Sequence, residues 1–236
     1  MGRDQIVRKY SMTYVLTCVG SHHNPLLVLL AAIICGLGST ALFLLLKRSR
    51  ECTHRRWAQW SALAALAAGI GVWATHFVAM LAFEPGLPVS FGFAPTALSV
   101  VLCILAFWIG LRVLGSRGEV WRAAAAGIVA GLGVALMHFV GMSAMIVPAQ
   151  IVYDRTLIAL GVGWSLIIFC AAFLLFNRSH GRFQVLAPAG LATIAVCVLH
   201  FTSMSAMTLV PDGNAVASAL HAREWLIAAV VWGSLT

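Results

Sequence analysis

Apolar runs of roughly 20 residues, the length needed to cross a bilayer core, recur along the chain and restrict its fold more than any other feature. Inside lipid, every backbone polar group must be hydrogen-bonded within the protein. Hydrophobic residues make up 61% of the 236 residues and charged residues only 9%, so no segment has the composition of a large soluble domain. The sequence therefore predicts an all-α polytopic membrane protein.

We expect seven transmembrane helices, the last one truncated by the end of the chain. The apolar runs cover 25–46, 58–83, 94–114, 123–147, 156–176, 184–209 and 225 onward. Residues 1–24 form an N-terminal tail whose mixed, polar composition differs from that of a cleaved signal peptide. Residues 25–236 form one helical membrane domain.

Basic residues gather in the loops that follow spans one, three and five, which predicts that these loops are cytoplasmic. These ten residues are Lys47, Arg48, Arg50, Arg55, Arg56, Arg112, Arg117, Arg122, Arg178 and Arg182. The opposite loops hold only Arg155 and Arg223. The N-terminus is then outside and the end of span seven cytoplasmic. The net charge of +8 reports this topology, and no basic–aromatic pattern predicts nucleic-acid binding.

One short motif occurs three times at a spacing of 62 residues. It reads HFVAM from His76, HFVGM from His138 and HFTSM from His200. A period of 62 residues contains two spans and two loops, so the repeating unit is a helix pair. Because each unit crosses the membrane twice, its copies are parallel. The sequence predicts three parallel helix-pair repeats of about 62 residues, followed by one extra helix.

The three motif histidines lie inside apolar spans, where an ionisable side chain is costly and a functional role is expected. They lie at similar depths in the outer half of the membrane or near its midplane, so they can converge. A methionine follows four residues later on the same helix face. These downstream methionines are Met80, Met142 and Met204, and two copies continue the same face with Met145 and Met207.

Imidazole and thioether ligands together favour copper, especially Cu(I), and the spans contain no carboxylates that would favour harder ions. We therefore expect a copper site. Its predicted ligands are His76, Met80, His138, Met142, His200 and Met204, with Met145 and Met207 completing the set or forming an entry path. Met137, Cys197, His22 and His23 are left open as further ligands. The plain alternatives are histidines that hydrogen-bond a neighbouring helix and methionines that fill gaps in the core.

Three other functions use similar residues. A haem-binding electron-transfer protein also uses intramembrane histidines, usually in facing pairs. A copper transporter needs a path that is polar on both sides of the site. An intramembrane zinc hydrolase needs a general base, and no carboxylate lies within the spans. No catalytic residue is predicted.

The repeated motifs and the paired spans resemble the MHYT domain, a bacterial seven-helix integral membrane sensor module. The family is named for a repeated Met-His-Tyr-Thr-like motif near the outer ends of three helices. Only Met137-His138 keeps the leading methionine, while Phe77, Phe139 and Phe201 stand where the family often has tyrosine.

The resemblance implies a multi-pass sensor of the bacterial inner membrane, embedded in lipid and without enzymatic activity of its own. It implies copper bound by the motif residues and detection of a diatomic gas (O2, CO or NO) or of redox state. It also implies signalling to a cytoplasmic output domain, which these 236 residues do not contain and which is fused after helix seven or carried by a partner protein. The chain is a possible homodimer.

Overall fold

We describe the fold from a computed structural model, which places residues 23–52, 54–116, 119–211 and 231–232. Six helices in this part are long and apolar enough to cross a membrane. They are α3 (Pro25–Arg50), α4 (His54–Ala82), α5 (Phe93–Leu114), α6 (Val120–Ser143), α7 (Arg155–Arg178) and α8 (Phe183–Ser205). The seventh span, predicted from residue 225 onward, lies outside the described residues except for 231–232.

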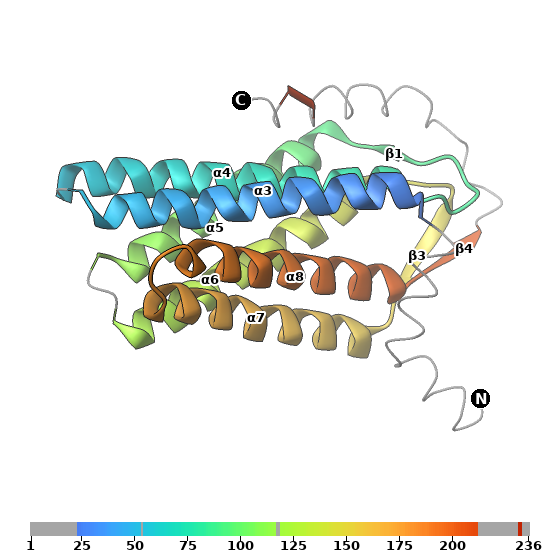
Figure 1. Cartoon of the computed structure of the whole chain (residues 1–236). Coiled ribbons are helices and arrows are strands. Elements are labelled where there is room, and N and C mark those ends of the chain that lie inside the picture. Colours follow the sequence, from blue (N-terminus) through green and yellow to red (C-terminus); the bar gives the residue numbers. More distant parts are fainter. Residues whose placement is uncertain (1–22, 53, 117–118, 212–230, 233–236) are drawn as a thin grey trace.

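The six helices form a ring of three pairs (Figure 1). Each helix packs against its neighbours in the chain, and α3 closes the ring against α8. The second helix of each pair is the more buried one: α4, α6 and α8 line the centre, whereas α3, α5 and α7 expose more of their apolar surface. We call α4, α6 and α8 the histidine helices, because each carries one copy of the motif.

Glycine allows the helices to approach each other closely. A Cβ added at Gly38 of α3 would lie 3.0 Å from the Cα of Gly71 in α4. A Cβ at Gly127 of α6 would lie only 2.7 Å from the Cα of Cys170 in α7. Backbone therefore packs on backbone at these two crossings, where no larger residue fits without moving a helix.

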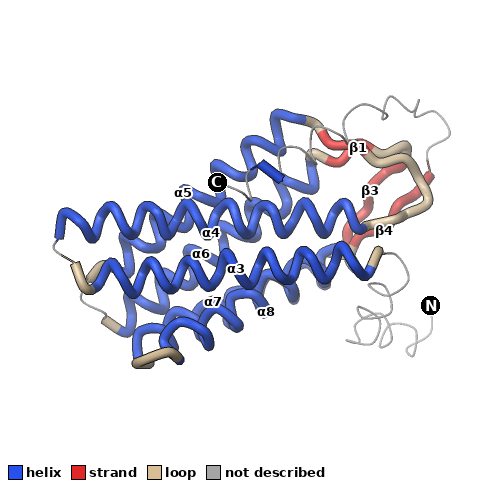
Figure 2. Tube along the Cα trace, turned by 45° about the horizontal axis from the view of Figure 1, so that its top comes forward, coloured by secondary structure: helices blue, strands red, loops and turns tan. Residues whose placement is uncertain are grey.

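Short antiparallel pairings join the two helices of each pair at one end of the bundle, which we call the strand end (Figure 2). His23 forms a bridge with Phe83, β1 (Ser90–Phe91) pairs with β2 (Met145–Ile146), and β3 (Ala149–Tyr153) pairs with β4 (Met207–Pro211). Each pair adds one equivalent backbone hydrogen bond. The N–H groups of Asn24, Gly92 and Asp154 donate to the carbonyls of Ala82, Ala144 and Ala206, at 2.8, 2.8 and 2.9 Å respectively.

These strands correct two predicted boundaries. The apolar runs suggested spans 123–147 and 184–209, but α6 ends at Ser143 and α8 ends at Ser205. The chain stays apolar beyond both points, and apolar composition alone does not separate the end of a helix from a short buried strand. Met145 and Met207 consequently begin strands and do not continue the helix faces that carry the histidines.

Basic residues occupy the opposite end of the bundle, which we call the basic end. Lys47 donates a hydrogen bond to the carbonyl of Gly181 at 3.2 Å. Arg50 donates to the side-chain oxygen of Asn177 at 2.9 Å, and its guanidinium lies 4.5 Å from the centre of the Phe176 ring. These contacts tie the end of α3 to the α7–α8 connection and so help to close the ring.

Candidate metal centre

The three motif histidines meet in the centre of the ring. His76 on α4, His138 on α6 and His200 on α8 are all buried. The Nδ1 atom of His76 lies 3.2 Å from Nδ1 of His138 and 3.3 Å from Nδ1 of His200. One ring nitrogen from each histidine lies within 4.8 Å of the other two. The sequence prediction that these side chains converge is thus reproduced by the fold.

Hydrogen bonds among the imidazoles alone do not satisfy this cluster. In a neutral imidazole each ring nitrogen carries either one hydrogen or one lone pair. Nδ1 of His76 faces two other Nδ1 atoms at hydrogen-bonding distance, but it can donate to one or accept from one, not both. The two contacts are also longer than the usual N–H···O distance of about 2.9–3.0 Å. A cation bound between the rings would accept all three lone pairs.

The spacing of the nitrogens fits such a cation. Two imidazole nitrogens bound at about 2.0 Å to one tetrahedral metal ion lie about 3.3 Å apart. The separations from Nδ1 of His76 to Nδ1 of His138 and of His200 are 3.2 and 3.3 Å, and the ligand atoms of all three histidines lie within 4.8 Å of one another. The ring planes are nearly perpendicular to one another, at 78 to 88°, so the rings approach a common point from different directions without stacking.

Each histidine ring is held by the phenylalanine that follows it in the motif. The His–Phe ring centres are 4.8, 5.0 and 5.1 Å apart in the three copies, and every pair is edge-to-face. This packing gives Phe77, Phe139 and Phe201 a structural role. A second constraint comes from α6, because a Cβ added at Gly141 would lie 2.6 Å from Nε2 of His76.

The methionines predicted as ligands fall into two groups. Met80, Met142 and Met204 are buried on the histidine helices, one turn beyond the histidines toward the strand end. Met145 is buried in β2 and Met207 is half-buried in β4. Only the first group therefore keeps the helical relation to the histidines that the sequence suggested.

A small cavity of about 40 Å³ adjoins the histidines. Its wall includes Thr75, Met137 and Leu199, the residues that precede the three histidines, and also Cys197. Met137 and Cys197 were open candidates in the sequence, and their place beside the cavity distinguishes them from the other sulfur residues. Thr75 was not predicted to lie at the site. Its position directly before His76 is the signal in the sequence that could have indicated this.

His23 lies near the same region, at the strand end. Its ring centre is 5.3 Å from that of Phe83 and 5.7 Å from that of Phe201, and the residue is buried. It packs beside the phenylalanine that supports His200. His22 lies outside the described residues.

Comparison with known proteins identifies related chains. The family described as the bacterial signalling protein N-terminal repeat, MHYT, matches residues 69–127 and 131–189, which is half of the chain. An uncharacterized signaling protein of Caulobacter vibrioides is 36% identical over 204 residues, covering 85% of this chain and 25% of that protein. No solved structure matches the chain.

Two relatives from Pseudomonas aeruginosa have more specific names. The cyclic di-GMP phosphodiesterase NbdA is 34% identical over 201 residues, covering 81% of this chain and 25% of that protein. The bifunctional diguanylate cyclase/cyclic di-GMP phosphodiesterase MucR is 32% identical over 192 residues, with coverages of 79% and 28%. The chain thus spans about a quarter of the length of the curated relatives it matches.

Proposed function

Since this chain belongs to the MHYT family of bacterial signalling proteins, we propose that it is a membrane-embedded sensory module with a copper site at its centre. The site senses a diatomic gas (O2, CO or NO) or redox state, and the module signals to a cytoplasmic output domain. The chain itself catalyses no reaction. His76, His138 and His200 hold the metal. The observation that carries the proposal is the convergence of the three buried histidines, with Nδ1 of His76 only 3.2–3.3 Å from Nδ1 of each of the other two.

The donors around the histidines favour copper over harder ions. Met137 and Cys197 border the cavity beside the imidazoles, and Met80, Met142 and Met204 are buried one turn away on the other side. Thioether and thiol sulfur prefer soft ions such as Cu(I). The described buried residues include no aspartate or glutamate that would favour magnesium, calcium or manganese. Bound copper would supply a one-electron redox change and a coordination position open to a small ligand.

The size of the cavity supports a small ligand. A volume of about 40 Å³ exceeds the ~10–15 Å³ that one water molecule needs, so a diatomic molecule fits. Pockets for drug-sized ligands occupy about 300–1,000 Å³, and a haem would need far more room than is present. The histidine nitrogens are also closer together than the ~4 Å that separates two axial ligands across a haem iron with bonds of about 2.0 Å. These observations favour a single ion over a haem.

A transporter is less well supported. Ion conduction needs polar or charged groups along a path to both sides of the membrane. Between the histidines and the basic end, alanines dominate the buried faces of the histidine helices, and no lysine, arginine, aspartate or glutamate is among the described buried residues. The interior on that side therefore offers little to a hydrated cation.

The relatives suggest where the signal goes. Two of them are named as cyclic di-GMP enzymes, and this chain aligns with only about a quarter of each. We place the basic end in the cytoplasm because of its lysines and arginines, in the inner membrane of a bacterium, with residues 1–24 outside. An output domain fused beyond the seventh span, or a partner protein, would receive the signal there.

The test is a metal analysis of purified protein. We would load the detergent-solubilised chain with Cu(I), remove weakly bound ions, and measure copper per chain together with an absorption spectrum. The comparison variants are the triple substitution His76→Ala, His138→Ala, His200→Ala and the control His180→Ala, which removes an exposed histidine at the basic end. We expect near-stoichiometric copper in the wild type and the control, and we expect the triple variant to lose it. Equal copper in all three proteins would refute the site, and a Soret band lost in the triple variant would replace copper with haem.

A further inference from the structure

The α4–α5 contact and the α6–α7 contact are equivalent in the repeat, but they differ at one crossing. Between α6 and α7, Gly127 packs against Cys170, and a Cβ at this glycine would lie 2.7 Å from the Cα of Cys170. The residues 62 positions earlier, on α4 and α5, are Ala65 and Trp108. A tryptophan replaces a small side chain at this crossing. The two helices therefore do not close on each other as α6 and α7 do.

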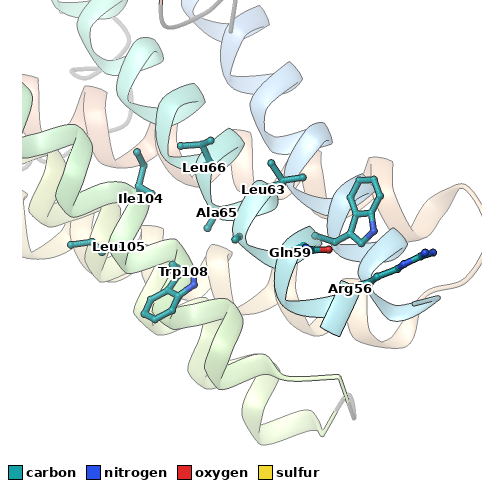
Figure 3. A pocket seen from close by; sticks show the side chains of 10 residues that line it. Arg56, Gln59, Leu63, Ala65, Leu66, Ile104, Leu105 and Trp108 are labelled. Carbon is teal, nitrogen blue, oxygen red and sulfur yellow. The ribbon is translucent and has the colours of Figure 1, made fainter. Parts of the chain in front are cut away.

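The next crossing toward the strand end is unchanged. A Cβ at Gly69 of α4 would lie 2.8 Å from the Cα of Ile104 in α5, so these helices touch here. Beyond this point, toward the basic end, a groove opens between them (Figure 3). Its volume is about 940 Å³. The groove is thus a local departure from the repeat, set by the pair Ala65 and Trp108 on its wall.

The groove has an apolar body and a polar mouth. Leu63, Leu66, Ile104 and Leu105 line the body, and Arg56 and Gln59 lie at the basic end of α4 (Figure 3). From residue 56 to residue 66, α4 rises about 15 Å, which is half the thickness of a bilayer core of about 30 Å. The groove therefore has the length of one leaflet.

The mouth is positively charged. Arg56 is exposed, and the two ion pairs found in the described chain, Arg48–Glu51 and Arg122–Glu119, do not involve it. A second cation lies close by. The guanidinium of Arg112 is 5.6 Å from the ring centre of Trp57 and 5.7 Å from that of Trp108. No described carboxylate forms an ion pair with either arginine.

We propose that this groove binds an anionic phospholipid, with one acyl chain between α4 and α5 and the phosphate at Arg56. Basic pockets between transmembrane helices bind anionic headgroups, and tryptophans favour the level of the headgroups. Trp60 and Trp108 line the groove and supply such rings. The proposal requires only that the helices span a membrane, so it stands apart from the copper site.

The experiment is a lipid titration followed by native mass spectrometry of the delipidated chain in detergent. The probes are dioleoyl phosphatidylglycerol, which is anionic, and dioleoyl phosphatidylcholine, which is zwitterionic. We expect phosphatidylglycerol to bind about fivefold more tightly, the effect of one arginine near a charged lipid. Arg56→Gln should reduce this preference. Arg178→Gln, an exposed arginine at the same end that does not line the groove, should preserve it.

A second variant tests the body of the groove. Ala62 is exposed and lines the groove, so Ala62→Trp fills it without disturbing the core and should weaken the tightest binding event for both lipids. Unchanged lipid preference in Arg56→Gln, or unchanged uptake in Ala62→Trp, would overturn the proposal. Dimers that disappear in Ala62→Trp would instead assign the groove to a second copy of the chain. An unaltered gel-filtration profile of each variant establishes that it is folded.

Discussion

Gly141→Ala should weaken metal binding although residue 141 supplies no ligand. The added Cβ would lie 2.6 Å from Nε2 and 3.0 Å from Cδ2 of His76. An ordinary van der Waals contact begins at 3.4 Å, so the imidazole must move by about 0.8 Å, the difference between 3.4 and 2.6 Å. Metal–ligand bonds tolerate deviations of only about 0.2 Å. Changes to groups that orient metal ligands typically cost about 10- to 100-fold in metal affinity, and we expect a loss of this size.

Competition with a chelator of known Cu(I) affinity would measure this effect. Gly190→Ala in α8 is the matched control, because it makes the same chemical change in a histidine helix at a site where an added Cβ meets nothing within 4 Å. The control should keep wild-type affinity. If Gly141→Ala also keeps it, then His76 either does not hold the metal or does not lie against α6, and the reasoning fails.

Three other substitutions test separate parts of the structure. Gly127→Ala should lower the free energy of unfolding by about 1–3 kcal/mol, because overpacking forces the backbones apart. The control is Gly163→Ala, at a site where an added Cβ meets nothing within 4 Å. Equal thermal unfolding of the two variants would contradict the close crossing. Asp154→Ala should cost about 0.5–2 kcal/mol, since this side chain accepts hydrogen bonds from the N–H groups of Thr156 and Leu157 at 3.0 and 3.3 Å; Asp154→Asn should retain most of that stability in the same thermal assay. Ala31→Val narrows the cavity beside the histidines and should weaken CO binding to the copper-loaded protein, measured by infrared spectroscopy, while the copper content stays unchanged.

The sequence was most informative where one physical requirement dominates. A bilayer demands about 20 consecutive apolar residues per helix, and the six predicted spans that fall in the described chain correspond to α3 to α8, with the ends of α6 and α8 corrected by the strands. Histidine is costly in lipid, so its presence at one position of each repeat pointed to a shared site. His76, His138 and His200 do meet there. The family resemblance drawn from the same motifs is confirmed by the MHYT match.

The remaining features depend on contacts between distant segments, which a single sequence does not specify. The strands at Met145 and Met207 form because each pairs with a residue just before the first helix of its own helix pair. Helical spacing alone placed both methionines on the histidine helices. The groove beside Trp108 was not predicted for a similar reason. It depends on the combination of Trp108 with Ala65 on the neighbouring helix, and a single sequence does not show which residues face each other. Whether the methionine sulfurs bind metal remains a prediction.

The strand end offers a fixed point from which a change at the histidines can be transmitted, and this leads to a final prediction. At the strand end, the carbonyls of Ala82, Ala144 and Ala206 accept hydrogen bonds from the chain before the first helix of each pair; we call these hydrogen bonds the clamp. Each histidine lies six residues before its clamp alanine, or about 9 Å of helix away. The histidine helices extend roughly 35–42 Å from that alanine to the basic end. A rigid helix pivoting at the clamp would therefore enlarge a displacement of its histidine about fourfold, by the ratio of these lengths. Site-specific spin labels at the basic ends of α4 and α6 would measure this movement. We take the shift of the histidines on copper loading as ~0.5 Å, the positional precision that functional sites require. The distance between the labels should then change by about 2 Å. A label distance unaffected by copper, in protein that has bound it, would rule out this pivot as the route of the signal.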